Sequence, residues 1–340
     1  MTKIRPLYYF DKKNAREMIS FLNDDVLFIN NIIFNPLAPI YRLLPLKFKN
    51  FPESYVLKEK REMRGLITVA PTKNPLKQME IQQLLFEENC YSYAEEMIQY
   101  VVSKYKAMGT ASIIVRIDDY LSDLIRTFVS KCGFSQISFE KLWKSQTNDN
   151  LSVSDFEAKF NPQMFRSFRN SDAPLASALF EEELLPNIRP LLVKGAKEFK
   201  DDLFKGLSYY TEYKYVYYER KTKRVYAFLN IRSTDNKNFV LDIINSAWDD
   251  INIEEIVAFA YYQIKKRTND AKLFVKTKKY VQQNEKIEKE LTDNKYECVQ
   301  NKVVLTNSSM RVIKSETQEK KYTVLGQFYS GLSVTNKSGV

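Results

Sequence analysis

Three acidic side chains stand where a carboxylate could accept a proton. Glu87 and Glu88 directly follow the apolar run at residues 79–86, and Asp242 interrupts the apolar run at residues 239–244. The chain contains no histidine, so proton transfer would fall to carboxylate, tyrosine, lysine, cysteine or water. We therefore take these three as catalytic candidates. The structural alternatives are a solvated strand end for the glutamates and a hydrogen-bonded interior carboxylate for Asp242.

The cysteines offer neither a metal site nor a redox pair. Cys90, Cys132 and Cys298 lie far apart in the sequence, and no two of them have the spacing of metal ligands or of a redox motif. A nucleophilic Cys90 at a helix N-terminus would need a base, and the sequence indicates none. We expect three buried thiols and no metal ion.

The elements that position these residues occur twice, at a displacement of about 160 residues. In each copy a hairpin-like pair of strands precedes an apolar run, which leads through a polar loop into a helix, a strand, a second helix and closing strands. The first copy comprises residues 54–70, 79–86, 92–108, 111–115, 119–132 and 133–144, and the second 213–232, 239–244, 252–267, 271–275, 279–294 and 295–306.

Strands alternating with amphipathic helices predict an α/β fold, a mixed sheet flanked by helices, built twice. The polar stretch at residues 145–155 is the expected boundary between the copies. We predict one domain over residues 1–147, a second over 156–314 and a flexible tail over 315–340.

The order of elements, the opening IRPL at residues 4–7, the loop before the central helix and the Cys-Gly-Phe at 132–134 together resemble the GNAT superfamily of acyl-CoA-dependent N-acyltransferases. The resemblance covers nearly the whole chain as two tandem, divergent GNAT-like copies. It implies that a Gln/Arg-x-x-Gly-x-Gly/Ala loop before the central helix holds the coenzyme A pyrophosphate on backbone N–H groups.

The first copy matches that loop only in its last position. The resemblance makes the loop of the first copy the candidate cofactor-binding segment for acetyl-CoA or another acyl-CoA: Asn89, Cys90, Tyr91, Ser92, Tyr93 and Ala94. In the second copy, Asp249, Asn252 and Glu254 take the corresponding places, and the acidic groups would repel phosphate.

Both loops also have a purely structural interpretation. Ser92 and Glu95 have the spacing of a capping box, as do Asn252 and Glu255, and a cap would occupy the N–H groups that a pyrophosphate needs. The resemblance further implies a tyrosine acid four residues before the Gly-Phe pair. Val129 and Leu291 stand in those places, so neither copy has the acid.

Charge and hydropathy constrain partners. The formal net charge is +10, but the basic residues are scattered, so we do not expect nucleic acid to be the partner. The Tyr-rich segment 209–226 could stack RNA bases, although alternating tyrosines equally suit a half-buried strand. No apolar run reaches the roughly 18 residues of a membrane helix, and no secretion signal is evident, so we expect a cytoplasmic protein without a membrane partner.

Two main hypotheses follow. The first is an acyl-CoA-dependent N-acyltransferase acting on a small-molecule or protein amine, with Glu87 or Glu88 assisting deprotonation of the amine. The second is a catalytically degenerate tandem module that binds a protein partner, suggested by the lost glycines and tyrosines. An RNA-associated protein is a third hypothesis, supported only by the net charge and the Tyr-rich segment.

Overall fold

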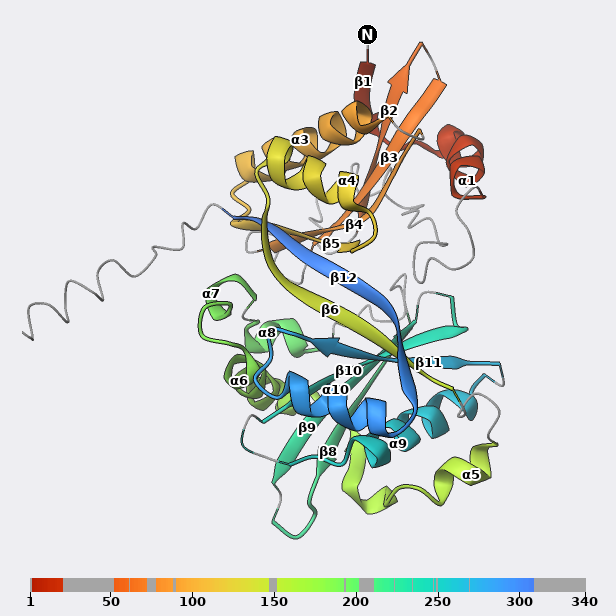
Figure 1. Ribbon diagram of the computed structural model, residues 1–340, viewed down its shortest axis with the longest axis vertical. Helices are drawn as coiled ribbons and strands as arrows, with labels where there is room; N and C mark the ends of the chain where they lie inside the picture. The colour runs from red at the N-terminus through yellow and green to blue at the C-terminus, as the bar shows by residue number, and fades with distance from the viewer. Residues whose placement is uncertain are drawn as a thin grey trace, which may run out of the picture. The chain divides into compact units, whose positions relative to one another are not determined.

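The predicted repeat is present as two copies of one succession of elements (Figure 1). The computed structural model describes residues 2–20, 52–60, 62–71, 78–87, 90–146, 152–192, 194–201, 211–222, 224–233, 235–246, 248, 250–268 and 270–308. The first copy consists of β1 (Thr2–Pro6), α1 (Lys12–Ser20), β2 (Glu53–Glu59), β3 (Glu62–Pro71), β4 (Gln78–Phe86), α3 (Tyr91–Ala107), β5 (Ser112–Asp118), α4 (Ser122–Arg126) and β6 (Ser135–Ser145).

The second copy repeats that order. It consists of β7 (Phe165–Ser167), α6 (Ala173–Glu183), β8 (Thr211–Tyr218), β9 (Val225–Ser233), β10 (Asn238–Asn245), α9 (Ile253–Lys265), β11 (Lys272–Lys278), α10 (Asn284–Asp293) and β12 (Tyr296–Ser308). The short helices α5 (Val153–Glu157), α7 (Arg189–Leu192) and α8 (Ala196–Phe199) lie between these elements along the chain. The fold class is therefore the predicted one, a mixed sheet flanked by helices.

Within the described residues, a single sheet of 12 strands joins the two copies, in the order β1-β2-β3-β4-β5-β12-β6-β11-β10-β9-β8-β7. The last strand of each copy thus lies beside β5 or β11 of the other copy: β12 is next to β5, and β6 pairs with β11. Figure 1 shows β6 and β12 running together through the centre of the sheet. The sequence predicted more than one closing strand in each copy, whereas the described residues contain one long strand in each.

This exchange carries apolar side chains into the opposite core. Val303 and Leu305 of β12 are buried in the cluster beneath α3, while Trp143 of β6 is buried in the cluster beneath α9. Full burial of one such aliphatic side chain contributes about 1.5–3 kcal/mol. Each core is therefore incomplete without a strand from the other copy.

The predicted domain limits of 1–147 and 156–314 stay a prediction. The contacts between residues do not divide the chain there, because they group Met1–Asn307 as one compact unit. Residues 315–340, predicted as a flexible tail, lie outside the described residues. Helix α5, which begins inside the expected boundary, packs on α9, where Phe156 stacks on Tyr261 with ring centroids 4.8 Å apart.

An Arg–Asp pair is repeated at the start of both copies. Arg5 donates two hydrogen bonds to the carboxylate of Asp11, at 2.7 and 2.9 Å, and Arg166 does the same to Asp172, both at 2.8 Å. A bidentate guanidinium–carboxylate pair fixes direction as well as distance. It holds the turn that follows the first strand of each copy. In the first copy the arginine is Arg5 of the IRPL segment, which therefore has a structural role.

Candidate functional site

Strands β4 and β5 pair along only part of their length. Their parallel register joins Gln78–Ile81 to Ser112–Val115, and the described residues show no pairing between them beyond that point. Strand β4 also has a bulge in its pairing with β3. Thr68 pairs with Gln83 and Val69 with Ile81, so Gln82 is an extra residue in β4. The carboxyl end of β4 is thereby free of the β5 ladder, just before the chain enters α3.

Helix α3 begins without a side-chain cap. Its N-cap residue is Cys90, whose side chain accepts no hydrogen bond from the helix, and Ser92 already lies in the first turn. The capping box predicted for Ser92 and Glu95 is therefore wrong, because the helix starts earlier than expected. An uncapped helix N-terminus presents backbone N–H groups and a positive dipole end, which suit an anion.

The remaining predicted loop residues have varied surroundings. Ala94 is buried under the helix, the Tyr93 hydroxyl donates to Glu59 at 2.9 Å, and the Tyr91 ring lies 5.5 Å from that of Phe86. Asn89 lies outside the described residues, as does Glu88.

Glu87 lies at the end of β4 in an exposed position. Arg64 donates to both of its carboxylate oxygens at 3.1 Å. An exposed ion pair of this kind contributes little to stability, about 0–1 kcal/mol. Glu87 therefore lies at a solvated strand end, as the structural alternative for this residue predicted.

The corresponding helix terminus in the second copy is closed. The Asn252 side chain accepts the backbone N–H of Glu255 at 3.0 Å, which confirms the predicted cap. The Glu255 carboxylate in turn accepts from the backbone N–H of Asn161 and from the Tyr217 hydroxyl. The cap occupies the Glu255 N–H, and the Glu255 carboxylate adds a negative charge beside the terminus, so the site is unfavourable for a phosphate.

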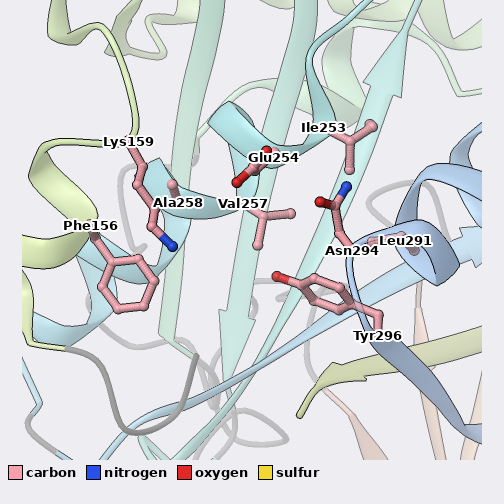
Figure 2. Close-up of a pocket in the computed structure, with 9 residues that line it drawn as sticks. All are labelled: Phe156, Lys159, Ile253, Glu254, Val257, Ala258, Leu291, Asn294 and Tyr296. Carbon is pink, nitrogen blue, oxygen red and sulfur yellow. The ribbon is translucent and has the colours of Figure 1, made fainter. Parts of the chain in front are cut away.

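A small cavity lies beside this terminus, as Figure 2 shows. Its volume is about 130 Å³, and residues of α5, α9, α10 and β12 contribute to its lining: Phe156, Lys159, Ile253, Glu254, Val257, Ala258, Leu291, Asn294 and Tyr296. Pockets for drug-sized ligands measure roughly 300–1,000 Å³. The cavity is too small for a molecule the size of coenzyme A.

Asp242 is held between two lysines. Its carboxylate lies 2.8 Å from Lys276 Nζ and 2.6 Å from Lys278 Nζ, and Lys278 also lies 3.3 Å from Glu183. Burial opposes ionisation, but the two ammonium groups outweigh it and hold the pKa of Asp242 well below its usual range. A carboxylate so strongly stabilised in its charged form is a weak proton acceptor at neutral pH.

A second ionic network, which the sequence did not predict, crosses the junction between the copies. Arg116 of β5 lies 2.6 Å from Glu80 and 2.8 Å from Glu140 of β6, and the Tyr280 hydroxyl donates to Glu140 at 2.6 Å. Burial raises the pKa of Glu140, but Arg116 and Lys276 outweigh burial and lower it to about 2. The alternation of polar and apolar residues within each strand did not indicate that these side chains, which come from segments far apart in the sequence, would lie together.

Asp118, the last residue of β5, was also missed. It is only 6% exposed, and its Oδ1 atom has no hydrogen-bond partner among the described residues. Its position in the apolar stretch that begins at Ala111 was a signal, because an interior carboxylate is costly unless it is used.

Several other predictions can be compared with the described residues. Cys132 is buried, but Cys90 is half-buried and Cys298 is exposed, so the expectation of three buried thiols is wrong for these two. Val129 and Leu291 stand on the elements that precede β6 and β12. Within the described ranges, no His, Cys, Asp and Glu side chains gather as metal ligands, and no helix is both long and apolar enough to cross a membrane.

The Tyr-rich segment forms the hairpin β8–β9, and its central rings face the core. Tyr215 and Tyr217 are buried beneath α9, and their hydroxyls bond to Gln263 and Glu255 at 3.1 and 3.0 Å. Buried rings cannot stack on RNA bases, so the interpretation as a half-buried strand is confirmed for these two tyrosines.

Comparison with solved structures identifies the fold. A tandem GNAT protein from the clavulanic acid biosynthesis pathway, solved without acetyl-CoA, matches with a TM-score of 0.57 and 10% identity over 92% of this chain and 99% of that chain. A GCN5-related N-acetyltransferase from Sphaerobacter thermophilus matches with a TM-score of 0.53 and 8% identity over 90% and 95% of the two chains.

No protein-family model matches the sequence, and no curated protein matches it. The structural likeness therefore establishes the fold: the chain has the tandem GNAT fold, two divergent copies joined in one unit.

Proposed function

We propose that the protein is an acyl-CoA-dependent N-acyltransferase with a single acyl-CoA site, in the first copy, acting on an amine. The observation that carries this proposal is the contrast between the two helix termini. Each helix follows a strand that extends beyond its pairing with the parallel neighbour, but the terminus of α3 has no side-chain cap, whereas Asn252 caps α9. The fold shared with GNAT acetyltransferases supports the reaction class.

The residues of the first copy fit the group that the reaction requires. The backbone N–H groups of Tyr91 and Ser92 in the first turn of α3 would receive the pyrophosphate, and the stretch of β4 beyond its pairing with β5 would receive the pantetheine amides. When bound, acyl-CoA supplies the acyl group as a thioester. Glu87 and Glu88 stay predictions for assisting amine deprotonation, and the cytoplasmic location also stays a prediction.

The test is calorimetric titration of the full chain with acetyl-CoA, repeated with Ser92→Glu. We expect one site for the wild type and loss of binding in the variant, because a carboxylate in the first turn of α3 would repel the pyrophosphate. The same carboxylate interacts favourably with the helix dipole, by about 0.3–1 kcal/mol. Lost binding would therefore not reflect unfolding.

Glu254→Gln is the matched control, because Glu254 occupies the corresponding first turn of α9. It should bind acetyl-CoA as the wild type does. A wild type that gives no heat and no thermal stabilisation at millimolar acetyl-CoA would refute the proposal and favour the degenerate binding module, since a micromolar site would add about 4 kcal/mol to stability.

A further inference from the structure

Asp118 combines burial with an unsatisfied oxygen at the edge of the sheet where the acyl-CoA site is proposed. Ile81 of β4 pairs with Val115 of β5, so Asp118 lies three residues further along β5, beyond the last paired position. Parallel strands end at the same edge, which places Asp118 at the edge from which β4 leads into α3. Its exposed fraction of 6% and its unpartnered Oδ1 need an explanation, because such an atom is costly to bury.

The second copy supplies the surroundings of Asp118. Gln300 of β12 hydrogen-bonds to the carboxylate, and the charge of Lys302, on the same strand, acts on it. Asp119 and the hydroxyl of Tyr120 are the neighbouring titratable groups on its own segment. Burial raises the pKa of Asp118 above its ordinary value, and Lys302 and Gln300 only partly oppose that rise. The carboxylate therefore accepts a proton more readily than an exposed one does.

Three other carboxylates within the described residues already have cationic partners. Arg64 holds Glu87 through both oxygens, and Lys276 and Lys278 hold Asp242. Glu140 is held by Arg116 and by the Tyr280 hydroxyl. Among the described residues, no cationic side chain lies within 4 Å of the Asp118 carboxylate, and its Oδ1 atom has no hydrogen-bond partner.

We propose that Asp118 is the catalytic base of the site in the first copy, binding the ammonium group of a primary amine acceptor, directly or through one water, and taking its proton. Gln300, from the exchanged strand of the second copy, is a positioning residue. This inference rests on the proposed function, which it deepens by naming the base and the cationic form of the acceptor.

The chemical step balances with these groups. The ammonium gives one proton to the Asp118 carboxylate and becomes a neutral amine. The amine lone pair then forms the C–N bond to the thioester carbonyl carbon, the C–S bond breaks, and the departing thiolate takes the second proton from nitrogen. The products are an amide, free coenzyme A thiol and a protonated Asp118, which returns its proton to water.

The experiment uses n-butylammonium chloride as the probe, added to the full chain with and without saturating acetyl-CoA, with binding followed by ligand-observed NMR at pH 7.5. We expect Asp118→Asn to weaken probe binding at least tenfold while acetyl-CoA binding changes less than twofold. Asp123→Asn, which changes an exposed carboxylate on α4, is the matched control and should change neither. Gln300→Ala should shift the pH profile of probe binding without abolishing binding.

The wild type gives an independent measurement if Asp118→Asn does not fold. Alkylammonium ions stay charged below about pH 10, so probe binding should weaken at acid pH only as Asp118 becomes protonated. Probe binding that is independent of pH, equal in Asp118→Asn, or absent while acetyl-CoA binds would overturn the inference. Asp118-dependent probe binding in a chain that does not bind acetyl-CoA would uphold the ammonium site and refute the proposed function instead.

Discussion

Lys278 lies between two carboxylates of the second copy, Asp242 at 2.6 Å and Glu183 at 3.3 Å. Glu183 is 1% exposed and also accepts the backbone N–H of Asn245 at 3.2 Å. Burial raises the pKa of Glu183 to about 7, and Lys278 only partly opposes this because Asp242 shares its charge. The sequence pointed to Asp242, but its two lysine partners keep it ionised, and of the two carboxylates Glu183 is the one with a pKa near neutral pH.

Glu183 should make stability depend on pH in a direction opposite to that of most carboxylates. Its pKa rises from 4.5 to about 7 on folding, so between those values the folded state binds more protons and this contribution to stability falls as pH rises. The unfolding free energy of Glu183→Gln minus that of the wild type should therefore be about 2 kcal/mol larger at pH 8 than at pH 5. Urea unfolding at both pH values measures this.

Exposed Glu181→Gln provides the control and should show no such gain. An equal difference between variant and wild type at the two pH values would mean that Glu183 is not protonated in the folded state.

At the scale of single elements, helix N-termini distinguish the two copies. Asn252 caps α9 through its side chain, while α3 starts at Tyr91 with no such bond. We expect Asn252→Ala to lower the unfolding free energy by about 1 kcal/mol, because an N-cap substitution costs that much. Ser92→Ala should cost distinctly less, since Ser92 makes no cap. Thermal denaturation of the two variants side by side is the measurement, and equal losses would contradict the assignment of the caps.

At the scale of the whole molecule, the exchanged strands make the two copies one folding unit. Leu305 of β12 completes the core beneath α3, and Trp143 of β6 completes the core beneath α9 and donates to Thr277 of β11 at 2.9 Å. The second copy therefore supplies part of the core of the first, and we expect the first copy not to fold without it. This accounts for a copy that keeps the fold without an open helix terminus.

A cut between the copies should not separate them. We expect a chain with a protease site inserted at residues 147–151 to elute, after cleavage, at the size of the intact protein, because β6 and β12 hold each fragment within the sheet of the other. Size-exclusion chromatography before and after cleavage measures this, with the same sample in denaturant as the control. Fragments that elute separately under native conditions would show that the copies are independent domains.

The sequence alone determined the repeat, the succession of elements up to the closing strands, the fold class and the cap at Asn252, because hydrophobic periodicity and capping act over a few residues. It could not place β12 between β5 and β6, since strand order depends on contacts between segments far apart in the chain. For the same reason the sequence favoured Asp242 and overlooked Asp118. Tertiary structure decided which carboxylate meets two lysines and which keeps an oxygen without a partner, and so which can accept a proton.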